Sequence, residues 1–180
     1  MTQCKRMTAR RLVAALALTL LAGGAATAQG VTRHKIPGSD FPIAQSVEVK
    51  AGTDLVFVSG AVPRPAVEGG DPADPATWGD TEVQTISVLA EIQSRLRRLE
   101  LDMGDVVMMR AYLVGTDTTG GRMDFAGFMR GYTRFFGTED QPNLPARTAM
   151  QVAGLARPAW LVEIDVVAAR PAAGAGDDAD

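Results

Sequence analysis

The feature that most constrains the fold is an apolar segment in the second half of the chain, DVVMMRAYLVG at residues 105–115. Apolar side chains occupy both sets of alternate positions, so both faces of a strand formed here would be apolar. Strands of this kind lie in the middle of a sheet that is covered on both sides. The segment therefore predicts a central strand in a sheet with both faces covered.

Helical and extended patterns alternate around this strand. One helix is expected to begin near Asp80, where Thr81 and Gln84 match a capping box. A second is expected over residues 123–136, whose aromatic residues form an apolar stripe typical of core packing. Residues 46–49 and 55–59 predict a β-hairpin, and two further strands follow Arg147 and Trp160. The predicted order is β-β-α-β-α-β-β, an α+β sheet with two helices on one face.

The helix-free face of such a sheet predicts association with other subunits. In the last two strands the apolar sets of alternate residues are expected to face the helices, which places Arg147 and Glu163 together on the other face. Leu55, Phe57 and the central strand make that face too apolar for open water. A symmetric oligomer would cover it.

Residues 1–28 have the pattern of a cleaved secretory signal peptide. A basic segment (4–11) precedes an apolar run (12–25), and Ala26 and Ala28 give the small-residue cleavage pattern. An uncleaved anchor is the alternative, although the run is short for a membrane span. The protein is therefore expected in the periplasm or secreted, with no membrane contact after cleavage. The pair Arg10 and Arg11 leaves open whether export uses the general or the twin-arginine route.

The mature chain is expected to contain one domain, residues 29–170, followed by a disordered tail, residues 171–180, that lacks apolar periodicity. Its long loop, residues 63–79, suggests an excursion near a site or interface, with Trp78 as its packing anchor. Whether this loop covers the site is left open by the sequence.

Composition argues against several chemistries. The one cysteine, Cys4, lies in the leader, so the mature chain has no thiol and no disulfide. One histidine, His34, makes a structural zinc site or a Ser-His triad improbable. After cleavage, 14 of the 18 basic residues remain against 21 acidic residues, which argues against nucleic acid as a partner.

Six segments together resemble the Rid family, the reactive intermediate deaminases, also called the YjgF family. In chain order they are LVFVSGAVP, TEVQTISVLAEI, DVVMMRAYLVG, DFAGFMRGYTRFF, LPARTAMQVAGL and LVEIDVVA, and they fall within residues 41–169. The most specific part is PAR before a strand, with VEI near the C-terminus. The resemblance implies a chorismate-mutase-like fold that assembles as a homotrimer with clefts between subunits.

The resemblance also implies a reaction. Better-known members hydrolyse enamine and imine intermediates, such as 2-aminoacrylate, to 2-oxo acids and ammonia without a metal or organic cofactor. Arg147 would bind the carboxylate of a 2-imino or 2-amino acid derivative, which suits the planar, permanently charged guanidinium. Glu163 would help to hold the attacking water. Further residues expected around the substrate are Ser59, Gly60, Ala149, Ile43 and Met129.

Three of these positions depart from the family pattern, and the departures keep a second hypothesis open. Ile43 stands where the family usually has tyrosine, Met129 where asparagine is frequent, and Ala149 where cysteine is frequent. The pocket is therefore expected to be more apolar than the better-known one. The main hypothesis is an imine or enamine deaminase. The alternative is a non-catalytic exported trimer that binds small carboxylates or a protein partner. For Arg147 itself the alternative role is a salt bridge at a subunit interface, with Glu163 as a candidate partner.

Overall fold

Six strands and two α-helices make up residues 30–170, the part of the chain that the computed structural model describes. The expected leader and the expected tail lie outside these residues. No helix within residues 30–170 is long and apolar enough to cross a membrane. The helices are α1 (Thr81–Arg97) and α2 (Phe125–Tyr132). The strands are β1 (Val31–Lys35), β2 (Ala44–Val49), β3 (Asp54–Ala61), β4 (Val106–Val114), β5 (Ala146–Val152) and β6 (Val162–Arg170).

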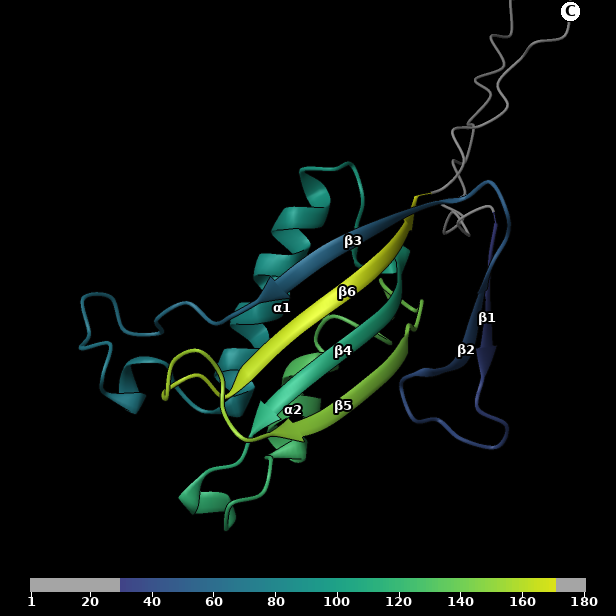
Figure 1. Cartoon of the computed structure of the whole chain (residues 1–180). Helices are drawn as coiled ribbons and strands as arrows, with labels where there is room; N and C mark the ends of the chain where they lie inside the picture. Colours follow the sequence, from purple (N-terminus) through teal and green to yellow (C-terminus); the bar gives the residue numbers. More distant parts are fainter. Residues whose placement is uncertain (1–29, 171–180) are drawn as a thin grey trace, which may run out of the picture.

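The strands form one mixed sheet in the order β1-β2-β5-β4-β6-β3 (Figure 1). The apolar segment forms β4, which lies centrally between β5, its parallel neighbour, and β6, its antiparallel neighbour. Both helices lie behind the sheet in Figure 1. The α+β class and the two helices on one face are confirmed, and the opposite face is left uncovered within one chain.

The predicted hairpin between residues 46–49 and 55–59 is wrong. β2 pairs with β1 at one edge of the sheet, whereas β3 pairs with β6 at the other edge. β1 was not expected because the segment VTRHK has no apolar alternation. Arg33 links this strand to the start of β4 by hydrogen bonds, since its Nη2 atom donates to the carbonyls of Gly104 (2.8 Å) and Val106 (3.1 Å).

Helix α1 begins where expected, but with a different cap. Asp80 is the N-cap, and its side chain accepts a hydrogen bond from the Val83 amide at 2.9 Å. Gln84 does not turn back to the cap. Its buried amide nitrogen donates to Gly79 and Ala159, both at 3.0 Å, while its oxygen accepts from the amide of Leu161 at 2.7 Å. The helix start is thereby tied to the segment that leads into β6.

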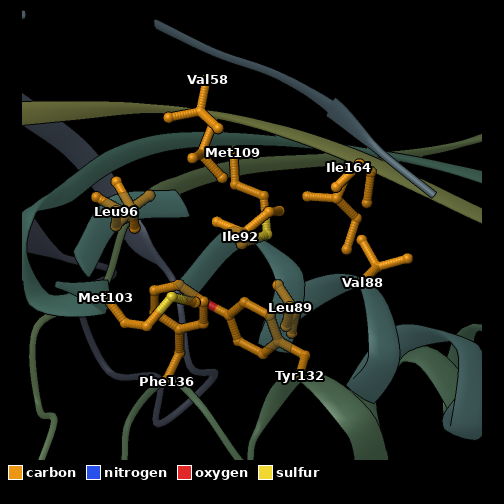
Figure 2. Packing of buried hydrophobic residues seen from close by; sticks show 14 of the residues in the cluster. Val58, Val88, Leu89, Ile92, Leu96, Met103, Met109, Tyr132, Phe136 and Ile164 are labelled. Carbon is orange, nitrogen blue, oxygen red and sulfur yellow. The ribbon is translucent and has the colours of Figure 1, made fainter. Parts of the chain in front are cut away.

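The apolar stripe of α2 packs in the core, as expected. The helix is shorter than predicted, because it ends at Tyr132 and the chain continues through turns to Gly137, which has a positive φ of 72°. Phe128, Tyr132 and Phe136 are completely buried. Figure 2 shows Tyr132 and Phe136 beside Met103 and Leu89, beneath the sheet residues Met109 and Ile164.

The orientation of β5 is opposite to the prediction. Arg147 lies beside Met109 and Ala149 beside Ala111 in the parallel register, and both β4 partners are buried against the helices. Residues paired in this way share a face of the sheet. Arg147 and Ala149 therefore face the helix side. The uncovered face of β5 carries Thr148, Met150 and Val152.

The loop at residues 63–79 is anchored by Trp78, as predicted. The Trp78 indole is buried, and its Nε1 atom donates to the carbonyl of Pro72 at 3.1 Å. Its ring meets Trp160 edge to face, with the centroids 5.8 Å apart. The loop is therefore packed against the segment that precedes β6.

Candidate active site in two halves

Arg147 lies at the start of β5, and four aromatic rings surround its guanidinium. The Cζ atom is 4.2 Å from the centroid of Tyr132 and 5.1 Å from that of Phe128. The rings of Phe41 and Phe125 follow at 5.5 Å and 5.9 Å. We call these four residues the aromatic box. Each distance lies within the range of cation–π attraction.

The charge of Arg147 has no carboxylate partner in the box. No ion pair between residues 30 and 170 includes this arginine, and its Nη1 atom is buried without a hydrogen-bond partner. Burial lowers the pKa of Arg147, and the neighbouring Tyr132 offsets part of this effect. A guanidinium still stays charged at any working pH. A buried cation with a free donor is a receptor for an anionic ligand.

The box is held together by Tyr132. Its hydroxyl donates to the carbonyl of Pro42 at 2.9 Å, which joins α2 to the segment before β2. Burial raises the pKa of Tyr132, so the phenol stays neutral beside the guanidinium. The packing of α2 against residues 41–42 thus fixes the position of the arginine.

A groove of about 490 Å³ reaches Arg147 from the opening between β2 and β5. These strands share only one residue pair, Ala44 with Ala146, and the β1–β2 hairpin turns away from the other four strands (Figure 1). Ile43 lines this groove together with Arg147, as expected. Other lining residues are Ile36, Pro37, Met108 and Thr148.

Ala149 and Met129 are not among the residues that line this groove. Ala149 follows Arg147 on the same face of β5 and packs against the core. Met129 follows Phe128 on α2 and is also packed against the core. What we call the arginine half-site is therefore Arg147 and Ile43 with the aromatic box around the charge, and the roles expected for Ala149 and Met129 stay predictions.

Glu163 belongs to a different place in the fold. It lies on β6, directly opposite Tyr112 of β4, on the uncovered face. The strand β3 bulges between Val58 and Ala61, and Gly60 in this bulge faces the Glu163 carboxylate. A Cβ atom at Gly60 would clash with that carboxylate, so any larger residue there would force the Glu163 side chain to shift.

A pocket of about 280 Å³ lies in front of Glu163, and Gly60, Tyr112 and Asp165 also line it. Ser59 lines a neighbouring pocket with Gly60 and Asp165. Its carbonyl is already engaged, since it accepts a hydrogen bond from Nη1 of Arg95 at 3.0 Å. We call Glu163, Gly60 and Ser59 the carboxylate half-site.

Within one chain the two half-sites do not meet. Arg147 lies beside Met109, and Glu163 lies beside Tyr112, three residues further along β4. With strand spacings near 4.8 Å and a rise near 3.3 Å per residue, the two Cα atoms are roughly 14 Å apart. Their side chains also leave opposite faces of the sheet. The expectation of one shared face was wrong. The alternative of an Arg147–Glu163 salt bridge at a subunit interface stays a prediction.

Sequence reasoning missed two sets of residues around these half-sites. The stripe on α2 was interpreted only as core, although the spacing of Phe125, Phe128 and Tyr132 also allows three rings to face one arginine. Phe41 gives no sequence signal. On the uncovered face, Arg110 and Tyr112 alternate on β4 as Glu163 and Asp165 do on β6, and that shared period of two was the available signal.

No group of three or more His, Cys, Asp or Glu side chains that could hold a metal ion lies within residues 30–170.

Comparison with known proteins defines the class. The family model described as Endoribonuclease L-PSP matches residues 39–170, so the chain belongs to this family. The chain is 28% identical over 142 residues to a RutC family protein of Haemophilus influenzae. The aligned residues make up 79% of this chain and 97% of that relative. The family expected from the six sequence segments, Rid or YjgF, is confirmed.

Solved structures share the fold. The Rid family protein YyfB of Yersinia pestis has a TM-score of 0.58 at 23% identity, over 77% of this chain and 98% of that one. A protein of unknown function from Pseudomonas aeruginosa has a TM-score of 0.53 at 24% identity, over 79% and 93%. At such identities the likeness concerns the fold alone.

Proposed function

We propose that the protein hydrolyses imine and enamine derivatives of 2-amino acids to 2-oxo acids and ammonia. The single observation that carries this proposal is the buried guanidinium of Arg147, which has a free donor atom, no carboxylate partner within residues 30–170, and a groove beside it. A substrate carboxylate supplies the missing charge. Family membership makes imine hydrolysis the reaction to test first.

The complete site would need two copies of the chain. The two half-sites lie on opposite faces of one sheet, so Glu163 would reach Arg147 only from a neighbouring subunit. The uncovered face supports such an assembly, because Phe57 is 75% exposed and Leu55, Met108 and Met150 are also exposed. The family resemblance implies three copies, with one cleft at each of three equivalent interfaces.

The proposed reaction uses few groups. Arg147 binds the carboxylate of the substrate, while Ile36, Ile43 and Met108 contact its side chain. Glu163 of the neighbouring copy accepts a proton from water as the water oxygen adds to the imine carbon. The π electron pair of the C=N bond moves to nitrogen, which receives the proton. Glu163 then takes the hydroxyl proton of the carbinolamine and passes it to the amino nitrogen. The C–N bond breaks as the C=O bond forms, which releases ammonia and the 2-oxo acid.

This chemistry needs positioning more than activation. The imine carbon is electrophilic and reacts slowly with water unaided, so orienting the two reactants and assisting one proton transfer accelerates the reaction. Neither step calls for a metal ion or an organic cofactor.

A non-catalytic carboxylate-binding protein is the second candidate. The observation that favours it is the largely apolar surrounding of Arg147. Four aromatic rings enclose its guanidinium, and Ile36, Ile43 and Met108 line its groove, where Gln45 and Thr148 are the further polar side chains. Such a site could hold a carboxylate ligand without turning it over. The family description names an endoribonuclease, but acidic residues outnumber basic ones in this chain, so we do not propose RNA as the substrate.

The deciding experiment measures ammonia release from freshly generated 2-imino acids by the purified protein, with the uncatalysed rate subtracted. Arg147→Ala is assayed beside it, and Arg98→Ala, which changes an exposed arginine at the end of α1, serves as the matched control. Acceleration that is lost in Arg147→Ala and kept in Arg98→Ala supports the deaminase. Carboxylate binding without ammonia release would favour the second candidate.

A further inference from the structure

We propose that the hydroxyl of Tyr112 is a second ligand of the attacking water, held in place by Asp165 and Arg110. This inference rests on the proposed function and adds a catalytic residue to it. The observation that prompts it is that Glu163 is so far the one side chain assigned to the attacking water, although Tyr112 and Asp165 line the same pocket.

The sheet register places four polar side chains together on the uncovered face. β4 and β6 run antiparallel, with Tyr112 opposite Glu163 and Arg110 opposite Asp165. Side chains at directly opposed positions have Cβ atoms about 5 Å apart. Tyr112, Glu163 and Asp165 also line the same pocket. Among the described residues that line this pocket, Tyr112 alone carries a hydroxyl.

Hydrogen bonds fix the direction of that hydroxyl. Tyr112 Oη donates to Oδ2 of Asp165 at 3.2 Å. The other carboxylate oxygen, Oδ1, accepts from Arg110 at 2.9 Å (Nε) and 2.8 Å (Nη2). Both oxygens of Asp165 are thus engaged, and the carboxylate cannot rotate without losing a contact. The Asp165 side chain is mostly buried, whereas that of Arg110 is about half exposed.

The donor role of Tyr112 toward Asp165 leaves its oxygen free to accept. A phenol has one hydrogen atom, and here it points at Asp165, so the lone pairs of Oη are available to a water in the pocket. Burial and the nearby Asp165 raise the pKa of Tyr112, and the phenol therefore stays protonated at any working pH. It acts as a fixed acceptor and takes no part in proton transfer.

Two acceptors define the orientation of one water molecule. One hydrogen atom of the water is directed at the Glu163 carboxylate and the other at Tyr112 Oη, which leaves an oxygen lone pair for the imine carbon. Glu163 takes its proton as the C–O bond forms and returns it to the imine nitrogen. The proton shared with Tyr112 stays on the oxygen until the C–N bond breaks, when it is transferred through Glu163 to the leaving nitrogen. Tyr112 keeps its own proton throughout.

The test separates a water ligand from a substrate contact. Tyr112→Phe removes one oxygen atom and keeps the ring, and we expect kcat to fall about 10- to 100-fold with KM changed less than about twofold. Tyr132→Phe is the matched comparison, because Tyr132 holds Arg147 in the other half-site. For that variant we expect the reverse, a higher KM with a smaller change in kcat.

Asp165→Asn provides a second variant with an independent prediction. An asparagine amide has one acceptor oxygen, so it cannot accept hydrogen bonds from Arg110 and Tyr112 through two oxygens. We therefore expect kcat to fall as in Tyr112→Phe. The double variant is expected to lose little more than either single variant, since both changes remove the same oriented water. Native mass and the thermal unfolding midpoint are measured for each variant, so that rates are compared only among assembled proteins.

Each outcome has a defined meaning. An active wild type with kcat unchanged in Tyr112→Phe overturns this inference and leaves the deaminase proposal intact. A rise in KM without a fall in kcat also overturns it, because Tyr112 would then contact the substrate instead. A folded wild type that releases no ammonia from any 2-imino acid overturns both proposals.

Discussion

The arginine half-site and the carboxylate half-site are built by different means. At the arginine half-site, rings from α2 and from the segment before β2 enclose a guanidinium that projects from β5. At the carboxylate half-site, the antiparallel register of β4 and β6 alone sets Glu163 beside Tyr112. The first depends on packing between layers and the second on pairing within one layer. A substitution should therefore affect stability more at the arginine half-site than at the carboxylate half-site.

The largest expected effect comes from replacing the cation in the aromatic box. Arg147→Met keeps much of the side-chain volume and removes an unpaired buried charge, so we expect a higher thermal unfolding midpoint. The same change removes the carboxylate receptor and should lower kcat/KM by about 10³-fold, as expected for the loss of a buried charge-assisted pair. Calorimetry and ammonia release measure the two effects. A lower midpoint with lost activity would show that the arginine is structural.

The next effect tests whether the halves come from different subunits. Arg147→Ala and Glu163→Gln are each expected to be nearly inactive alone. When the two variants are unfolded together and reassembled at equal amounts, one site in about four would combine an intact Arg147 with an intact neighbouring Glu163, if subunits mix randomly in a closed ring. Ammonia release should therefore recover to about a quarter of the wild-type rate. No recovery in verified mixed assemblies would place both groups in one chain.

A smaller effect is expected at the face that would bring the halves together. Phe57→Asp places a charge in the exposed apolar area of β3 and should weaken subunit association. We expect a mostly monomeric mass at micromolar protein, with activity reduced about tenfold because only the remaining assembled fraction has complete sites. Val67→Asp is the control, since Val67 is also exposed and apolar but lies in the loop at residues 63–79. Light scattering and ammonia release check both. An unchanged mass for Phe57→Asp would mean that subunits associate through another surface.

The smallest effect concerns the carboxylate half-site alone. Gly60→Ala introduces a Cβ atom against the Glu163 carboxylate, which has to move away from the bulge. We expect kcat to fall about fivefold, because misplacing an acid-base group by a fraction of an ångström weakens but does not abolish its contribution. The affinity for a small carboxylate should stay the same, since Arg147 is unaffected. Titration calorimetry beside the rate assay checks this difference, and a matched loss of affinity would contradict it.

Local sequence signals predicted the elements well where they were strong. The apolar segment at residues 105–115 forms the central strand, and the stripe on α2 enters the core, because both patterns persist over many residues. The N-cap residue of α1 could be predicted less well from the sequence. Asp80 and Thr81 are adjacent, and both are favourable N-cap residues. Which of the two caps the helix depends on where the chain enters the helix.

The face taken by β5 could not be predicted in the same way. Arg147, Ala149 and Gln151 alternate with Thr148, Met150 and Val152, and the second set is the more apolar one. A single strand offers no further criterion, yet a shift of one residue exchanges the two faces. The parallel register with β4 determines which face of β5 is buried, since it aligns Arg147 and Ala149 with buried partners.

The sequence by itself thus determined the fold class, the family and the identity of Arg147 and Glu163 as the residues to examine, because these depend on periodicity and on short motifs. The tertiary structure decided which strands pair, which face each of the two residues takes, and that four rings enclose the arginine. These features arise from contacts between segments far apart in the chain, such as Phe41 with residues 125–147. No local pattern encodes such contacts, because their free energy appears only when the layers pack.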